Sequence, residues 1–195
     1  MEQKRILVIA GPTGVGESTI TKKIIKDYPI FKKLISATTR KPRLKEKHGI
    51  DYYFFSNKKF KEEIKKGNIF EYQNTMDKNI YYGSYKPELD KKISTGSNVI
   101  VNPDIVGTKF YKENFKATTI FIAPKSIDEL KKRLITRNSS ISARELKKRL
   151  DYAKNEIKKE AHFYDYIVIN EQNKLETAVN KVVSIINNEG YKLKK

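Results

Sequence analysis

The stretch "ILVIAGPTGVGEST", Ile6–Thr19, gives the plainest structural signal in this chain. An unbroken apolar run, Ile6–Ala10, leads into glycines at positions 11, 14 and 16, and helix-forming residues follow. A strand, a glycine-rich turn and a helix in this order predict a phosphate-binding loop, because glycine lets backbone N–H groups converge on phosphate oxygens. A plain glycine turn is the alternative, and the strand–loop–helix context favours the phosphate site.

One residue departs from the pattern of such loops. The pattern reads glycine, four residues, glycine, lysine, then serine or threonine, and Glu17 stands where the lysine belongs. That lysine normally bridges the terminal phosphates and follows the charge during transfer. At about 4 Å and an effective dielectric constant near 20, each unit of charge is worth roughly 4 kcal/mol. We therefore expect an enzyme that merely lost this lysine to be slowed by orders of magnitude.

The sequence leaves three compensations for Glu17 open. The carboxylate can help to hold a metal ion or a monovalent cation, which then supplies the missing positive charge. A lysine or arginine from elsewhere in the chain can enter the site. Alternatively, the site binds nucleotide weakly and catalyses poorly. A helix N-terminus tolerates a carboxylate well, so we expect the fold to be unaffected, whether Glu17 is native or introduced.

The composition limits the class of protein. A length of 195 residues suits one domain, or one core domain with small insertions. The absence of cysteine excludes disulfides, thiol chemistry and cysteine-based zinc sites, and His48 and His162 are too few for a histidine-rich metal site. No apolar run approaches the roughly 18 residues that span a membrane. We therefore expect a cytoplasmic protein with no signal peptide and no membrane partner.

The charge balance is strongly basic. The chain has 41 lysine and arginine residues against 23 acidic ones, a net charge of +18. This balance suits an anionic partner, but scattered lysines also serve solubility alone. No block of six basic residues and no recognised nucleic-acid motif occurs, so we expect no nucleic-acid partner. The oligomeric state stays open between monomer and homodimer.

Apolar runs alternate with helical patterns along most of the chain. The expected strands are residues 5–10, 32–36, 98–102, 118–123 and 164–170. Near-continuous apolar strands bounded by helices indicate a parallel sheet covered on both faces. Ser126 with Glu129, and Ser142 with Glu145, predict capping boxes that begin two helices. A final helix shows an apolar stripe from Leu175 to Ile186, which we interpret as core packing.

Residues 37–97 break this rhythm with short aromatic strands at 51–56, 69–73 and 80–84. We interpret residues 37–84 as an inserted subdomain with its own small, partly antiparallel sheet. Residues 1–36 and 85–195 then form the core. A polar, basic stretch at about 138–149 separates two expected helices and is a candidate mobile lid.

These features occur together with a series of longer motifs. They are "SATTRKPR" at 36–43, "GIDYYFFS" at 49–56, "IFEY" at 69–72, "YYGS" at 81–84, "PDIVG" at 103–107, "LKKRLITR" at 130–137 and "YDYIVIN" at 164–170. In this order and at these spacings, the chain resembles the guanylate kinase family over nearly its whole length. The resemblance implies an α/β fold of the P-loop NTPase type, with a five-stranded parallel sheet, an inserted GMP-binding subdomain with a small mixed sheet, and a helical lid.

The resemblance also implies an activity in purine nucleotide metabolism, the transfer of the γ-phosphoryl group of ATP to GMP. ATP and Mg²⁺ are the expected cofactors, and Ser18 is the expected metal ligand; a monovalent cation joins them only under the first of the three compensations for Glu17. The residues expected on the ATP side are Gly11, Thr13, Gly14, Val15, Gly16, Glu17, Ser18, Thr19 and Asn170. The residues expected on the GMP side are Ser36, Arg40, Arg43, Tyr52, Glu71, Tyr82 and Ser84.

Chemistry supports these roles. The arginine fork suits a phosphate group, which fits Arg40 and Arg43. A carboxylate accepts from both N1–H and N2–H₂ of guanine, which fits Glu71; adenine lacks this donor pair. The resemblance further implies which residues are catalytic: lid arginines, which would neutralise charge on the transferred group, and an acid near the guanine amino group and magnesium. They are Arg133, Arg137, Arg149 and Asp104.

The departures from the family pattern lie on the donor and metal side. Besides Glu17, the motif usually written Glu/Asp-x-Asp-x-Gln-Gly has Asn102 in place of the first acid and Val106 in place of the glutamine. Three interpretations follow. The chain is a guanylate kinase; or a catalytically weak relative that binds GMP or a phosphorylated partner through the retained pocket; or, least favoured, a basic nucleic-acid-binding protein.

Overall fold

Strand β1, Ile6–Ala10, is buried along its whole length at the centre of a parallel sheet. Its side chains alternate between the two faces of that sheet. Leu7 and Ile9 join one hydrophobic cluster, and Ile6, Val8 and Ala10 join another on the opposite face. This arrangement explains why the strand has no polar face in the sequence. The computed structural model describes residues 4–75 and 79–193.

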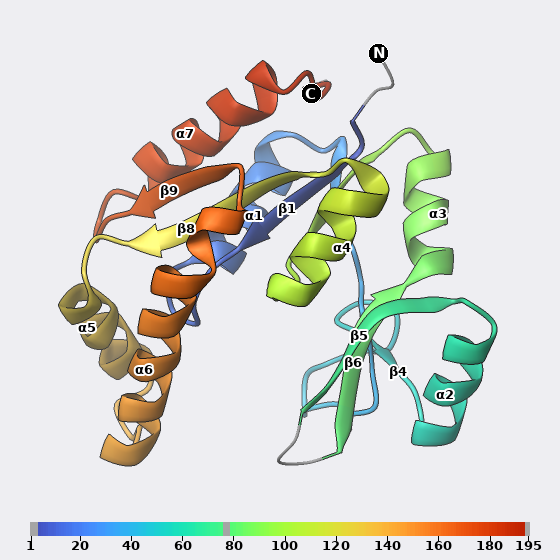
Figure 1. Ribbon diagram of the computed structural model, residues 1–195, viewed down its shortest axis with the longest axis horizontal. Coiled ribbons are helices and arrows are strands. Elements are labelled where there is room, and N and C mark those ends of the chain that lie inside the picture. Colours follow the sequence, from blue (N-terminus) through green and yellow to red (C-terminus); the bar gives the residue numbers. More distant parts are fainter. Residues whose placement is uncertain (1–3, 76–78, 194–195) are drawn as a thin grey trace.

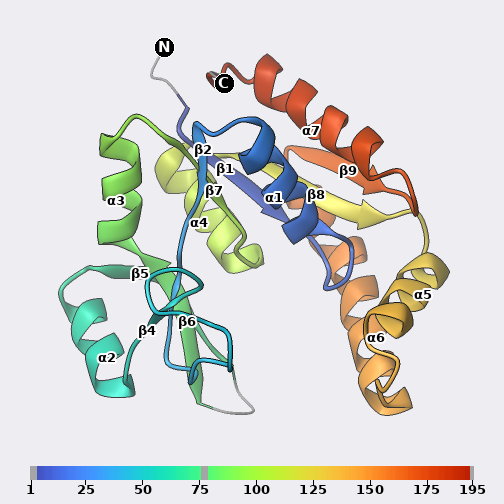
Figure 2. The same cartoon turned by 180° about the vertical axis from the view of Figure 1, so that it is seen from behind.

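The main sheet has the order β2-β7-β1-β8-β9, and every neighbouring pair is parallel. Besides β1, its strands are β2 (Phe31–Lys33), β7 (Asn98–Val101), β8 (Thr118–Pro124) and β9 (Tyr166–Asn170). Helices α1 (Glu17–Asp27) and α7 (Leu175–Asn188) cover one face, and α4 (Ile105–Phe115) covers the other (Figures 1 and 2). The expected five-stranded α/β sheet is confirmed.

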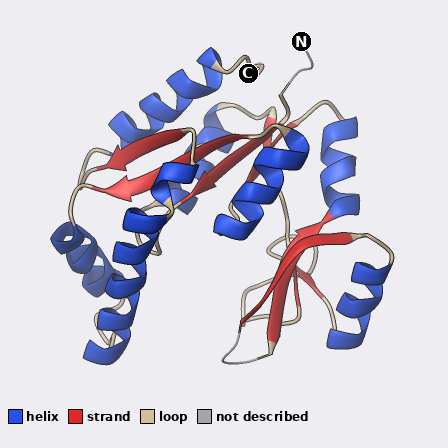
Figure 3. Ribbon diagram, viewed as in Figure 1, coloured by secondary structure: helices blue, strands red, loops and turns tan. Residues whose placement is uncertain are grey.

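A second, mixed sheet has the order β4-β3-β6-β5. Its strands are β3 (Ala37–Thr38), β4 (Tyr53–Phe54), β5 (Ile69–Thr75) and β6 (Ile80–Tyr85), and α2 (Asn57–Lys65) and α3 (Lys86–Ser94) flank it (Figure 3). A small separate core contains Ala37, Phe60 and Ile69, with aromatic rings packed against it. The aromatic strands of the sequence therefore form their own small sheet, as expected.

Helices α5 (Ile127–Arg137) and α6 (Ala143–Lys159) pack against each other on the opposite side of the molecule from the small sheet (Figure 1). A short 3₁₀ helix, Ala161–Phe163, follows α6. The sequence placed the candidate lid at 138–149, but only residues 138–142 form the connection. Residues from Ala143 onward belong to α6, because Ser142 caps that helix by accepting from the N–H of Glu145 at 3.2 Å.

Of the two hydrogen bonds that each expected capping box would contain, the one accepted by the serine side chain is confirmed. Ser126 and Ser142 each accept a hydrogen bond from the N–H three residues on. The carboxylates of Glu129 and Glu145 instead pair with Arg133 and Arg149, one turn further along each helix.

Strand bounds differ from the sequence pattern by a few residues. The second strand is Phe31–Lys33 rather than 32–36, and the aromatic strand at 51–56 is reduced to Tyr53–Phe54. Residues 1–3, 76–78 and 194–195 of the expected units lie outside the described residues. Among the described residues, no helix has an apolar stretch long enough to cross a bilayer.

The turn after β1 is fixed by the last residue of β9. The side-chain amide of Asn170 donates to the carbonyl of Val15 at 2.7 Å, and both groups are buried. Gly16 has φ +92°, and a Cβ added there would lie 2.5 Å from Nδ2 of Asn170. Only glycine therefore allows Asn170 to reach beneath the loop.

We expect Gly16→Ala to destabilise the protein more than Gly96→Ala. Gly96 has φ +78° and nothing within 4 Å of an added Cβ, so its substitution reports backbone strain alone. The contact with Asn170 should add roughly 1–3 kcal/mol to the loss in the free energy of unfolding, measured by urea denaturation. Equal losses at the two positions would contradict the close packing of Asn170 under the loop.

Candidate functional site

A cavity of about 460 Å³ lies against the loop between β1 and α1; we call it the loop pocket. Residues from the loop, the first turns of α1 and helix α5 line it. They are Pro12, Thr13, Gly14, Gly16, Glu17, Ser18, Thr19, Lys22, Arg133 and Arg137. The phosphate-binding loop of the sequence therefore borders an open cavity with basic side chains on the far wall.

The loop backbone is oriented by its contacts on the other side. The carbonyl of Val15 accepts from Asn170 at 2.7 Å and from Nη1 of Arg133 at 3.2 Å. In a trans peptide the N–H points opposite to the preceding carbonyl. These two contacts therefore turn the N–H of Gly16 away from the core. The side chain of Val15 is fully buried in the core, and Val15 is not among the residues that line the pocket.

Arg133 is held in place rather than free. Its Nε donates to Gln172 at 2.8 Å, and its Nη2 donates to the carbonyl of Asn170 at 2.7 Å and pairs with Glu129. The guanidinium of Arg137, the last residue of α5, has no hydrogen-bond or ion-pair partner within residues 4–75 and 79–193. Of the two arginines on the pocket wall, Arg137 has the freer guanidinium.

Glu17 occupies the first turn of α1 and faces a partly desolvated environment. Burial raises the pKa of its carboxyl to about 7, and the positive charge of Lys33 on β2 acts in the opposite direction. Lys33 reaches this region because α1 packs over β2. Near neutral pH, Glu17 is therefore divided between its neutral and charged forms.

The loop pocket suits a magnesium ion that is held mostly by phosphate and water. Ser18, whose side chain is a hydroxyl group, is one of the residues that line the pocket. No group of three or more histidine or acidic side chains that could cage a metal exists among the described residues. Mg²⁺ commonly uses one or two protein ligands together with substrate phosphates. Nearby, the Oδ1 of Asn102 is buried without a hydrogen-bond partner in the described structure, whereas its Nδ2 donates to Ile9 O at 2.8 Å.

A second cavity, of about 280 Å³, lies between the small sheet and the start of α4; we call it the small-sheet pocket. It is lined by Ser36, Tyr52, Glu71, Tyr72, Gln73, Tyr82, Gly83, Asn102, Pro103, Asp104, Val106 and Gly107. Its walls come from strands β5 and β6, from the segments before β3 and β4, and from the loop between β7 and α4.

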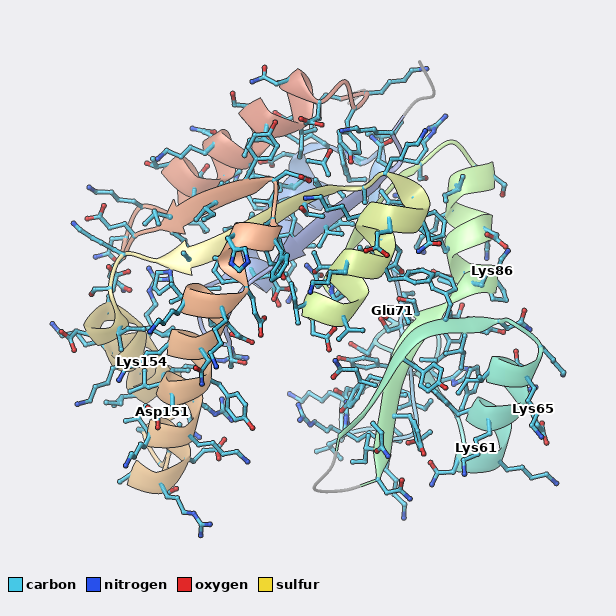
Figure 4. All side chains as sticks on the ribbon, in the orientation of Figure 1. Lys61, Lys65, Glu71, Lys86, Asp151 and Lys154 are labelled. Carbon is cyan, nitrogen blue, oxygen red and sulfur yellow. The ribbon has the colours of Figure 1, made fainter. Side chains whose placement is uncertain are left out.

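Glu71 enters this pocket because of a β-bulge. The register of β5 against β6 shifts between Phe70 and Tyr72, and Glu71 has φ +49°. Its carboxylate lies so close to Gly107 that an added Cβ there would be 2.2 Å from Oε1. Figure 4 shows Glu71 where the small sheet meets α4. A non-glycine residue in this strained conformation often marks a functional site.

The surroundings of Glu71 favour its neutral form when no ligand is bound. Burial first, and repulsion from Asp104 second, raise the pKa of the Glu71 carboxyl to about 8, while a hydrogen bond from Ser84 opposes the shift. Ser84 donates to Glu71 at 3.4 Å and is itself contacted by the hydroxyl of Tyr111 at 2.7 Å. Asp104 caps α4 by accepting from the N–H of Gly107 at 3.0 Å.

Arg40 lies next to the small-sheet pocket, against two of the tyrosines that line it. Its Nε donates to the hydroxyl of Tyr82 at 3.2 Å, and its guanidinium lies 5.5 Å from the ring centre of Tyr52. Glu46 pairs with Nη2 of Arg40 at 2.9 Å and also accepts from the N–H of Arg43 at 2.8 Å. The carboxylate of Glu46 therefore contacts both arginines of the "TTRKPR" segment, Arg40 through its side chain and Arg43 through its backbone.

The structure brings most of the expected residues to the two pockets. Of the expected loop residues, all but Gly11 and Val15 border the loop pocket, together with Arg133 and Arg137. The expected residues that border the small-sheet pocket are Ser36, Tyr52, Glu71, Tyr82 and Asp104. Arg40 and Ser84 reach it through Tyr82 and Glu71. Asp104 belongs to this second pocket and is absent from the residues that line the loop pocket.

Other expected residues lie apart from the pockets in this structure. The guanidinium of Arg149 pairs with Glu145 on α6 and lines neither pocket. Arg43 is exposed and contacts Glu46 through its backbone. The side-chain amide of Asn170 donates its hydrogen bond to the carbonyl of Val15 and lines neither pocket.

Sequence reasoning missed Lys22, Lys33, Glu46 and Tyr111. Lys22 lies one helical turn after Ser18, and this spacing was available in the sequence. Glu46 follows Arg43 at the spacing of a turn, where its own N–H donates to the Arg43 carbonyl. The contacts of Lys33 and Tyr111 depend on how distant elements pack, and no local signal reveals them.

Comparisons with known proteins agree with this geometry. The family model described as guanylate kinase matches residues 3–189. The guanylate kinase of Clostridioides difficile (strain 630) is 37% identical over 189 residues, 96% of this chain and 89% of that protein. The guanylate kinase of Clostridium acetobutylicum is 40% identical over 182 residues, 93% of this chain and 84% of that protein. The crystal structure of guanylate kinase from Anaplasma phagocytophilum has a TM-score of 0.73 at 26% identity, covering 97% of this chain and 88% of that one.

The contact between Glu46 and Arg40 gives a test of the role of Arg40 next to the small-sheet pocket. We expect Glu46→Gln to raise the KM for GMP by about three- to fivefold, because the guanidinium of Arg40 loses the partner that orients it. The KM for ATP should not change. Asp51→Asn is the matched control, since Asp51 accepts from the N–H of Lys47 in the same loop without touching Arg40. A lower KM for GMP in Glu46→Gln would instead mean that Glu46 competes with the phosphate.

Proposed function

The chain belongs to the guanylate kinase family, and we propose that its loop pocket binds ATP while its small-sheet pocket binds GMP. The reaction transfers the γ-phosphoryl group of ATP to GMP and yields ADP and GDP. An oxygen of the GMP phosphate forms a bond to the γ-phosphorus. The bond from that phosphorus to the β–γ bridging oxygen breaks, and ADP leaves with the electron pair.

The observation that best supports GMP as the acceptor is the carboxylate of Glu71 at the bulge of β5. The bulge directs a partly desolvated acceptor group into a pocket of nucleobase size. Guanine presents N1–H and N2–H₂ on one edge, and an ionised carboxylate accepts from both. Adenine would leave the buried charge without partners, which costs binding free energy. We propose Ser36, Ser84 and Asp104 as further groups around the base.

The other end of the same pocket supports a phosphate clamp. Arg40, Tyr52 and Tyr82 lie together, and Arg43 is tied to them through Glu46. Guanidinium groups and tyrosine hydroxyls donate to phosphate oxygens with good geometry. We propose that these four side chains hold the GMP phosphate, and that residues 37–84 act as the GMP-binding unit.

On the donor side, we propose that the backbone from Gly11 to Thr19 receives the triphosphate of ATP. Loop N–H groups and the dipole of α1 stabilise phosphate charge. Ser18 would hold a magnesium ion, which neutralises the β- and γ-phosphates when bound. Arg137 is positioned to stabilise the transferred group, and Arg133 contributes mainly by fixing the loop. Arg149 would contribute only if α6 moved toward the loop pocket.

The assignment is tested by the nucleotides consumed. With ATP and magnesium present, GMP should release ADP and GDP in equal amounts, measured by chromatography, and AMP should be a poor acceptor. Omission of GMP is the control for plain ATP hydrolysis. Undetectable turnover at high enzyme concentration, with magnesium and potassium supplied, would contradict the assignment. Binding of GMP without turnover would then favour the weak relative that only binds.

The raised pKa of Glu71 predicts how GMP binding depends on pH. Below its pKa of about 8, the carboxyl of the free protein is mostly protonated, whereas guanine needs the ionised form. GMP affinity should therefore rise about tenfold per pH unit up to this pKa and level off above it, with release of a proton on binding.

Calorimetry in two buffers of different ionisation enthalpy measures this proton release. Glu71→Gln cannot ionise at this position, so its GMP binding should be weaker and should retain only the titration of the GMP phosphate. Equal proton release in the parent chain and in Glu71→Gln would rule out Glu71 as the titrating group.

A further inference from the structure

The loop pocket contains a lysine that the loop pattern does not require. Lys22 lines the pocket from α1, on the same side as Ser18 and one helical turn further on. Side chains of a helix lean toward its N-terminus, so a residue covers the turn before its own position. The long side chain of Lys22 therefore extends over the turn that contains Glu17 and Ser18.

Lys22 is exposed and has no ion-pair partner in the part of the chain that the structure describes. Its neighbour Lys23 is different, because it pairs with Asp27 at 2.9 Å and with Glu176 at 3.6 Å. The other basic groups on the pocket wall come from α5, and Arg133 is already bound to the loop and to β9. Among the described residues, Lys22 is thus a lysine without an ion-pair partner on α1, the helix that follows the loop.

The charge of Glu17 also has a nearby counterpart. Lys33 on β2 acts electrostatically on the Glu17 carboxylate from beneath α1. When Glu17 is ionised, the set of Glu17, Lys22 and Lys33 carries one net positive charge. Because Lys33 offsets the charge of Glu17, the ammonium of Lys22 is left as a positive charge on the pocket wall that a phosphate can use.

We propose that Lys22 is a catalytic residue that contacts the terminal phosphates of ATP and replaces the ammonium group missing at position 17, while Lys33 offsets Glu17. The inference rests on the proposed function of the loop pocket. It assigns the second of the compensations left open by the sequence, a lysine that enters the site from another position, and it needs no additional metal ion.

The test is a double-mutant cycle between positions 22 and 17, read as ATP-dependent phosphorylation of GMP. Lys22→Met should lower kcat/KM for ATP about 100-fold, as removal of one donor to the transferred group does elsewhere. Lys22→Arg should retain most of the activity. Glu17→Lys restores the usual ammonium, and in that background Lys22→Met should cost less than about threefold.

Lys26→Met is the matched control, since Lys26 lies on α1 one turn beyond Lys22 and lines neither pocket. It should leave kcat/KM unchanged. Within each background, the parent chain or Glu17→Lys, substitution of Lys22 should leave the GMP affinity from calorimetry and the thermal unfolding midpoint unchanged, which separates a catalytic role from a structural one.

Each outcome bears on one assignment. If the parent chain does not phosphorylate GMP, the proposed function fails and the role of Lys22 fails with it. If the parent chain is active and Lys22→Met retains its activity, only the assignment of Lys22 is overturned. An equally large loss from Lys22→Met in the Glu17→Lys background would show that Lys22 does not substitute for the missing ammonium. If Lys22→Met fails to fold, Lys22→Gln is measured in both backgrounds with the same expectations.

Discussion

The backbone carbonyl of Val15 fixes the loop after β1 to the elements that surround it. It accepts from Asn170 at the end of β9 and from Arg133 on α5, so the loop after β1 is anchored by two elements far away in the sequence. The anchoring turns the following N–H outward, and glycine at position 16 is what leaves room for the Asn170 amide. A loop fixed in this way would need no reorganisation to bind a phosphate through its amides, as we propose, and preorganised sites stabilise charge in this manner.

The acceptor side depends on a different device, a bulge in β5. The bulge places Glu71 against Gly107 and Ser84, at the junction of the small sheet with α4. The carboxyl that would read guanine is thereby desolvated before the base arrives, and its raised pKa is the cost of that position. At the other end, Glu46 orders Arg40 with a carboxylate in the place of a phosphate. Both ends of the pocket are therefore prepared by contacts within the protein.

Much of the fold could be predicted because its signals are local. The apolar strands, the glycines of the loop and the serine caps of α5 and α6 depend on neighbouring residues, and the resemblance added the grouping of Arg40, Tyr52, Tyr82 and Glu71 around one pocket. Other features depend on packing between distant elements. The bulge at Glu71, the commitment of Arg133 to the loop, and the approach of Lys33 to Glu17 require β5, α5 and β2 to be placed first. The connection at 138–142 is shorter than its polar composition indicated, because basic residues from Ala143 onward form the exposed surface of α6.

We propose that the loop accepts a triphosphate despite Glu17, and that Lys22, a lysine outside the usual pattern, faces this triphosphate. The most direct measurement is a crystal structure of the chain with magnesium, GMP and a non-hydrolysable ATP analogue bound together. We expect the γ-phosphoryl group to lie against the amides between Gly14 and Thr19, with the ammonium of Lys22 beside it and the Glu17 carboxylate turned toward Lys33. A loop whose amides are instead filled by the Glu17 carboxylate, with no room for the analogue's phosphates, would contradict it.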